Sequence, residues 1–160
     1  MEEEIDDFFE DGQSADEAPP DNRSGARQIA LKALYSQISN EDCAKDQVQM
    51  LTSQYQSSQA VEDFANVIVD HVDGHITTLD GLIKETSTQW SPERIAHIDR
   101  IILRMGIAEI LYLEDVPAPV AIDEAIELAR TYSTAKSYAF VNGILDTIAK
   151  RNKSDLTSRD

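Results

Sequence analysis

Apolar residues recur at helical spacing through the longest amphipathic stretch of the chain. Between residues 60 and 83 they are separated alternately by four and three positions, at Ala65, Val69, Val72, Ile76, Leu79 and Ile83. This spacing places them on one face of a helix, whereas a half-buried strand would alternate apolar and polar residues. The pattern predicts one continuous helix of about six turns. Gly74 and Gly81, seven residues apart on one face, predict close packing against another helix.

Helical spacing also decides between two interpretations of residues 139–151, AFVNGILDTIAKR. Asn142-Gly143 is a strong signal for a hairpin turn, but the apolar residues around it follow helical offsets rather than strand alternation. We therefore predict a helix that continues through Gly143. Because a glycine inside a helix costs roughly 0.5–1 kcal/mol relative to alanine, its presence predicts a neighbouring backbone that passes close to it.

Other segments complete an all-α pattern of about seven helices. The first begins near Ser24, a residue type favoured at the N-cap, and a short helix surrounds residues 48–51. Ser91-Pro92-Glu93 supplies a cap, a first-turn proline and a first-turn acid for another helix. A break near Asp99 would let that residue cap the next helix. Residues 120–133, VAIDEAIELARTYS, precede the last one.

The acidic residues are concentrated at the N-terminus. The net charge of the chain is -16, and residues 1–22 hold ten Asp and Glu but no Lys or Arg. The remaining residues carry fourteen Lys and Arg and twenty Asp and Glu, a net charge of -6. With few apolar residues and Pro19-Pro20 near its end, the segment 1–22 is predicted to be a disordered acidic tail. One helical domain over 23–152 and a flexible C-terminus over 153–160 follow it.

Several classes of protein lack support in the sequence. Cys43 is the only cysteine and cannot form an internal disulfide, and no apolar run is long enough to cross a membrane, so we expect a cytoplasmic protein. His71 and His75 have the spacing of one helix face but lack both a third ligand and the adjacent acid of zinc proteases. With no phosphate-binding loop or cysteine cluster, we expect no catalytic residue, no cofactor and no metal.

Basic residues gather at the predicted start of the first helix. Arg23, Arg27 and Lys32 lie where the positive end of the helix would also attract a phosphate. Tyr35 follows and offers a ring on which a base could stack. An ordinary solvated helix start accounts for the same residues, so their spacing leaves both interpretations open.

Four stretches of the helical region match one known pattern when they are taken together. They are ARQIALKALY at 26–35, ERIAHIDRIILRMGIAEI at 93–110, VPAPVAIDEAIELAR at 116–130 and FVNGILD at 140–146. In this order they resemble the NusB family of bacterial transcription antitermination factors. The resemblance implies two packed helical bundles without catalysis or cofactor. It also implies that the protein binds the boxA element of nascent ribosomal RNA with NusE, a small-subunit ribosomal protein, in an RNA polymerase complex that resists termination.

The resemblance further implies roles for individual residues. The RNA-binding positions of the family correspond to Arg23, Arg27 and Tyr35 on the first helix and to Lys136, Tyr138 and Phe140 near the start of the last one. The partner-facing positions correspond to three residues of the motif ERIAHIDR, namely Glu93, Asp99 and Arg100.

Two departures from the family pattern keep alternatives open. DNRSGAR holds two arginines where family members often carry a dense run, and the tail places ten negative charges beside the expected RNA site. Besides an RNA-binding antitermination factor, we therefore keep a helper in ribosomal RNA maturation and a protein adaptor with weak or no RNA binding. A monomer and a homodimer both stay open as states of the free protein.

Overall fold

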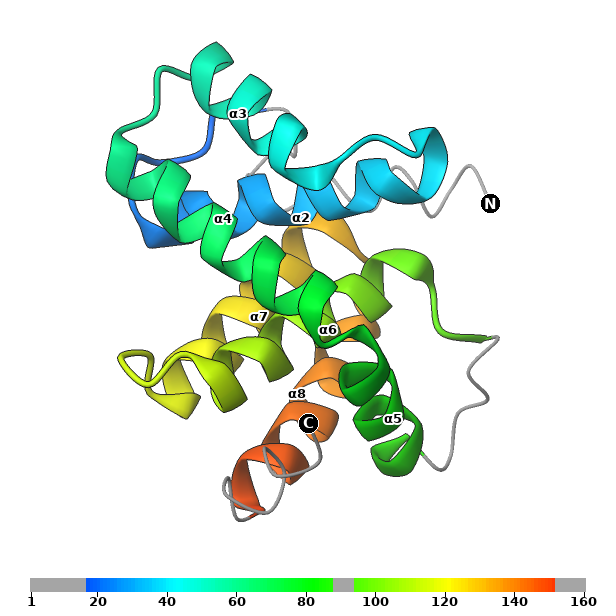
Figure 1. Ribbon diagram of the computed structural model, residues 1–160. Coiled ribbons are helices and arrows are strands. Elements are labelled where there is room, and N and C mark those ends of the chain that lie inside the picture. Colours follow the sequence, from blue (N-terminus) through cyan, green and yellow to red (C-terminus); the bar gives the residue numbers. More distant parts are fainter. Residues whose placement is uncertain (1–16, 88–93, 152–160) are drawn as a thin grey trace. The chain divides into compact units, whose positions relative to one another are not determined.

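Seven α-helices and no strand make up residues 17–87 and 94–151, the part of the chain described by the computed structural model (Figure 1). The helices are α2 (Arg23–Asn40), α3 (Ala44–Gln54), α4 (Gln59–Gly74), α5 (Ile76–Thr86), α6 (His97–Tyr112), α7 (Ala118–Tyr132) and α8 (Ser137–Lys150). The all-α class is confirmed. The helices form two compact units, one with α2 to α4 in Ala18–Gly74 and one with α5 to α8 from His75 onward. None of the described helices is long and apolar enough to cross a membrane.

In the first unit, α2 packs against both α3 and α4. The predicted stripe of α2 is buried at Ile29, Ala30, Ala33 and Leu34, but Ile38 in the last turn is exposed. Facing residues come from both partner helices and include Val48, Val61, Ala65, Ile68 and Val69. The core of this unit is therefore built from the apolar residues that helical spacing selects.

The N-cap of α2 is Asn22 rather than Ser24. The Asn22 side chain accepts a hydrogen bond at its Oδ1 from the backbone N–H of Gly25, 3.0 Å away. Asparagine and serine are both favoured N-caps, so composition alone does not separate the two positions.

Residues just before α2 also belong to the first unit. Asp21 Oδ1 accepts a hydrogen bond from the backbone N–H of Ser58, which directly precedes α4, at 2.8 Å. The carbonyl oxygen of Pro20 lies so close to Gly25 that a Cβ at that glycine would overlap it. The predicted tail reached residue 22, whereas residues 20–22 make defined contacts with the starts of α2 and α4. Residues 1–16 and 152–160 lie outside the described part.

The predicted single helix over residues 60–83 is two helices. α4 ends at Gly74 and α5 begins at Ile76, with His75 between them at φ -126° and ψ 24°. The apolar spacing continues across this break, which is why periodicity predicted no interruption. A Cβ at Gly74 or Gly81 would meet nothing within 4 Å, so the predicted close packing at these glycines was wrong.

In the second unit, α6 contacts α5, α7 and α8. It begins at His97, after non-helical residues at 95 and 96, so a break does lie near Asp99. The predicted helix cap at Asp99 is wrong, because this residue lies inside the first turn of α6. A Cβ at Gly106 would come within 2.8 Å of Leu145 Cδ1 in α8. Gly143, by contrast, lies in α8 as predicted but in open space. The close backbone approach that was predicted at Gly143 is therefore wrong, and the tight contact at Gly106 is with a side chain of α8. The predicted cap at 91–93 lies outside the described residues.

Candidate nucleic-acid interface

Arg23 and Arg27 share one aromatic ring. Their Cζ atoms lie 4.4 Å and 5.1 Å from the ring centroid of Phe64 in α4. Because residues four apart project from the same side of a helix, both guanidinium groups of α2 can reach this ring. A cation over an aromatic face contributes about 0.5–2 kcal/mol. The Phe64 ring therefore contacts both of the arginines that were predicted at the start of the first helix.

The two arginines differ in exposure. Arg23 is exposed, whereas Arg27 is only 3% exposed. A buried guanidinium has no room for a phosphate beside it unless the surrounding side chains move. Arg23 is therefore the member of the pair that can meet an anion directly.

Lys32 and Tyr35 complete the predicted group on α2. Lys32 Nζ donates a hydrogen bond of 3.4 Å to the hydroxyl oxygen of Tyr55, the C-cap of α3, and lies 5.5 Å from the centroid of that ring. This places the Lys32 ammonium in a contact within the first unit. Tyr35 is exposed and presents its ring to the solvent.

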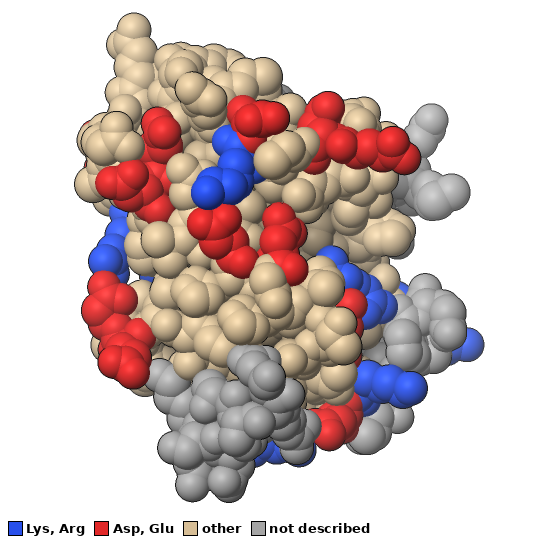
Figure 2. Space-filling view, in the orientation of Figure 1, with Lys and Arg blue, Asp and Glu red and all other residues tan. Residues whose placement is uncertain are grey.

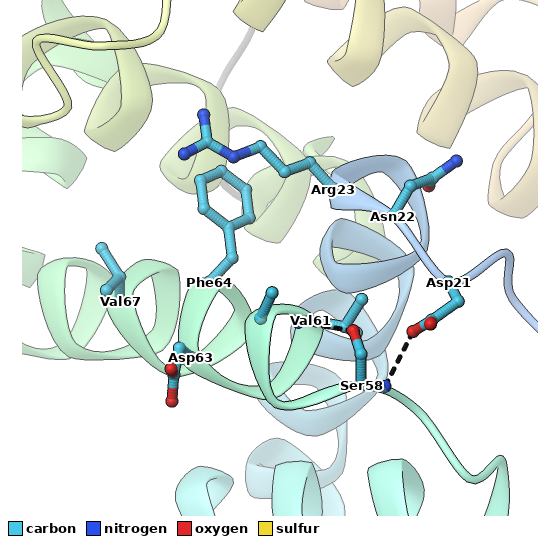
Figure 3. Close-up of a pocket in the computed structure, with 9 residues that line it drawn as sticks. Asp21, Asn22, Arg23, Ser58, Val61, Asp63, Phe64 and Val67 are labelled. Atoms are coloured by element: carbon cyan, nitrogen blue, oxygen red, sulfur yellow. Dashed lines mark hydrogen bonds between the residues drawn. The ribbon is translucent and has the colours of Figure 1, made fainter.

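A pocket of about 470 Å³ lies beside Arg23, between the start of α2 and the first half of α4 (Figure 3). Arg23 and Phe64 line it together with Asp21, Asn22, Ser58, Ala60, Val61, Asp63 and Val67. In Figure 3 the Arg23 side chain crosses from α2 to lie over the Phe64 ring. Phe64 was not predicted as a site residue, because nothing in the sequence pairs it with Arg23.

The second predicted group lies in the other unit, around the start of α8. Lys136, at the N-cap position of α8, and Tyr138 are exposed, whereas Phe140 is half-buried. The Cζ atom of Arg130 in α7 lies 5.4 Å from the Tyr138 ring centroid. Arg130 also pairs with Glu127 through Nη1 and Oε1 at 3.0 Å. Arg130 was not predicted, and it adds a cation at the ring of Tyr138.

The three predicted partner-facing residues have different surroundings. Asp99 is 7% exposed, and its carboxylate accepts hydrogen bonds from the hydroxyls of Ser133 and Ser137. Arg100 is half-buried, and Glu93 lies outside the described residues. The structure thus gives Asp99 hydrogen bonds inside the second unit, and the contribution of Glu93, Asp99 and Arg100 to partner binding stays a prediction.

Charges on the face drawn in Figure 2 are mixed. Among the described residues seen there, Lys and Arg side chains alternate with Asp and Glu rather than forming one continuous basic surface. A polyanion would therefore meet separate Lys or Arg side chains on this face rather than a continuous positive surface.

His71 and His75 do not share a helix face. His71 lies in α4, whereas His75 lies in the turn after it and stacks on Tyr112 with ring centroids 3.9 Å apart. Over residues 17–87 and 94–151, no group of three His, Cys, Asp or Glu side chains could hold a metal ion.

Comparison with known proteins agrees with this architecture. The sequence profile of the NusB family matches residues 24–150. The transcription antitermination protein NusB of Finegoldia magna is 36% identical over 135 residues, which are 83% of this chain and 97% of that protein. The protein of the same name from Thermodesulfovibrio yellowstonii is 38% identical over 138 residues, covering 80% and 91% of the two chains.

Comparison with solved structures also shows similarity to NusB. T. maritima NusB matches with a TM-score of 0.76 and 29% identity, covering 86% of this chain and 97% of that one. A chain from a crystal structure of antitermination factors NusB and NusE in complex with double-stranded RNA matches with a TM-score of 0.71 and 26% identity, covering 80% and 96%. Fold and site define an all-helical protein of two compact units, with an arginine pair at the start of its first described helix. The chain belongs to the NusB family.

Proposed function

We propose that this protein is a non-catalytic RNA-binding transcription antitermination factor that works in the cytoplasm. With NusE it binds boxA-type RNA of nascent ribosomal transcripts and joins an RNA polymerase complex that resists termination. The observation that carries the proposal is the exposed Arg23 at the start of α2, ordered by Phe64, in a member of the NusB family. The complex of NusB, NusE and double-stranded RNA formed by a similar chain supports the choice of partners.

The charges at the start of α2 predict that RNA binding by this protein alone is weak. Backbone N–H groups at a helix start and an adjacent arginine both favour a phosphate. Arg27 is buried and Lys32 is bonded to Tyr55, so few phosphates are neutralised directly. Each phosphate contact adds about 0.7 to the slope of log K against log salt concentration for a single strand. We therefore expect a shallow slope and a strong dependence on NusE.

A titration tests this proposal. Labelled single-stranded boxA-type RNA is mixed with the full-length protein, with purified NusE and with both, and anisotropy is followed over a salt series. The mixture is expected to bind at least about tenfold more tightly than either protein alone, which corresponds to about 1.4 kcal/mol. Absence of RNA binding in all three samples would contradict the proposal.

One observation favours an adaptor with little RNA binding as the second candidate. Two carboxylates, Asp21 and Asp63, line the pocket beside Arg23 and oppose the approach of a phosphate. In that case the protein would bind NusE without improving its affinity for RNA. The same titration separates the candidates, because the mixture would then bind RNA no more tightly than NusE alone.

A further inference from the structure

We propose that the pocket beside Arg23 receives one unpaired RNA base, which stacks against the pair formed by Arg23 and Phe64. This inference rests on the proposed RNA-binding function and assigns it a base-binding subsite. Single-stranded RNA is commonly held by stacking its bases on aromatic rings and on the planar guanidinium of arginine. Both kinds of surface line this pocket.

The walls of the pocket suit a flat apolar group. Val61, Phe64 and Val67 recur every three residues along α4 and line one side of it (Figure 3). Val67 is 39% exposed, which is high for a valine in a packed helix and leaves an apolar edge uncovered. The volume of about 470 Å³ falls within the range of roughly 300–1,000 Å³ found for small-molecule sites. Val61 and Phe64 are 3% and 8% exposed, so a base that enters this space would contact mainly Val67 and the Arg23 guanidinium that lies over the Phe64 ring.

The charges around the pocket favour an uncharged base over a negatively charged phosphate. Asp21 and Asp63 line it, and their carboxylates would repel a phosphate placed inside. Each already accepts one hydrogen bond, Asp21 from the Ser58 N–H and Asp63 from Gln59 Nε2. Their remaining lone pairs can accept hydrogen bonds from the N–H groups of a base. The uncharged base therefore belongs in the pocket, with its phosphate outside, toward the exposed Arg23.

Abasic scanning of the RNA tests this assignment. Single-stranded boxA-type RNAs, each lacking one base, are bound to full-length wild type, Phe64→Leu and Arg23→Lys, each with NusE present. For wild type, removal of one particular base is expected to weaken binding about fivefold or more. Leucine keeps an apolar side chain without the ring, and lysine keeps the charge without the planar group. In both variants the penalty at that position is expected to shrink to within about twofold.

A second variant reports on the pocket without touching the stacking pair. Val67→Trp places a fluorophore at the exposed edge, and Val120→Trp places one at a valine of α7 that is similarly exposed, 43%, and does not line the pocket. RNA is expected to quench the added tryptophan at position 67 but not at position 120. Circular dichroism of both variants checks that the helices are retained.

The outcomes separate this inference from the proposed function. RNA binding with no abasic penalty, or with the same penalty in wild type and both variants, would overturn the base subsite and leave RNA binding intact. Quenching at position 67 by NusE without RNA would mark the pocket as a protein contact and also overturn the subsite. Failure of wild type to bind RNA even with NusE would overturn both.

Discussion

Ser133 Oγ donates a hydrogen bond of 2.5 Å to Oδ1 of Asp99. The other carboxylate oxygen, Oδ2, accepts one of 2.8 Å from Ser137 Oγ. Asp99 lies in the first turn of α6, Ser133 is the C-cap of α7 and Ser137 is the first residue of α8. One buried carboxylate thus connects three helices, which explains why a charged residue is buried at this position.

Asp99→Ala is expected to lower the free energy of unfolding by about 1.5–3 kcal/mol, because hydrogen bonds to a charged group are lost and two buried hydroxyls lose their acceptor. Urea denaturation measures the change. Asp123→Ala removes an exposed carboxylate from α7 and serves as the control, with an expected change within about 0.5 kcal/mol. Equal stability of the two variants would show that the hydrogen bonds of Asp99 contribute nothing measurable.

We expect substitution by alanine to have opposite effects on stability at Gly106 and at Gly143. Gly106→Ala brings a Cβ against Leu145 Cδ1, the end of a buried side chain that must shift to make room, so we expect it to destabilise the second unit by about 1 kcal/mol, the lower end of the range for overpacking. Gly143→Ala adds its Cβ in open space within α8 and is expected to stabilise by about 0.5–1 kcal/mol. Thermal and urea unfolding of both proteins give the signs. A stabilising Gly106→Ala would contradict the close approach of α6 and α8.

The two arginines on Phe64 are expected to respond differently to alanine substitution. Arg23→Ala should weaken RNA binding and make the salt slope about 0.7 shallower, the contribution of one phosphate contact to a single strand. Arg27→Ala should chiefly lower stability, by about 1 kcal/mol, because the buried side chain packs on the ring. Salt-dependent anisotropy and urea denaturation separate the effects. A larger change of salt slope for Arg27 than for Arg23 would reverse these roles.

The acidic N-terminal segment predicts competition with RNA. Residues 1–16 hold eight Asp and Glu and no Lys or Arg, so their negative charge precedes Arg23 by only a few residues. Removal of residues 1–16 is therefore expected to tighten RNA binding at low salt, with a gain that shrinks as screening increases. The deletion stops before Asp21, which accepts a hydrogen bond from the Ser58 N–H, and Asn22, which caps α2. Matching affinities of both proteins across the salt series would exclude autoinhibition.

Sequence periodicity predicted the helices well and their interruptions poorly. The last helix follows from the spacing of Val141, Ile144, Leu145 and Ile148, all of which are buried. The break at His75 could not be predicted in this way, because the apolar spacing of α4 continues into α5. The spacing of apolar residues shows which side of a helix is apolar. The same spacing results whether the residues lie in one continuous helix or in two consecutive helices.

The candidate site could be predicted only in part, because its residues contact others that are distant in the sequence. The basic start of α2 was visible in the sequence, but the ring of Phe64 that orders it comes from another helix. Asp99 was expected at a helix cap, whereas it lies inside the first turn of α6 and its hydrogen bonds go to Ser133 and Ser137. Such pairings depend on how helices pack, which a single sequence does not encode locally.

The central claim is that RNA meets the protein at the start of α2. Nuclear magnetic resonance of the isotope-labelled full-length protein, titrated with single-stranded boxA-type RNA in the presence of unlabelled NusE, tests it most directly. We predict that RNA shifts the backbone amide signals of residues 21–27 and 58–67 beyond the shifts caused by NusE alone. RNA-dependent shifts confined to other residues, with these two segments unchanged, would contradict the claim.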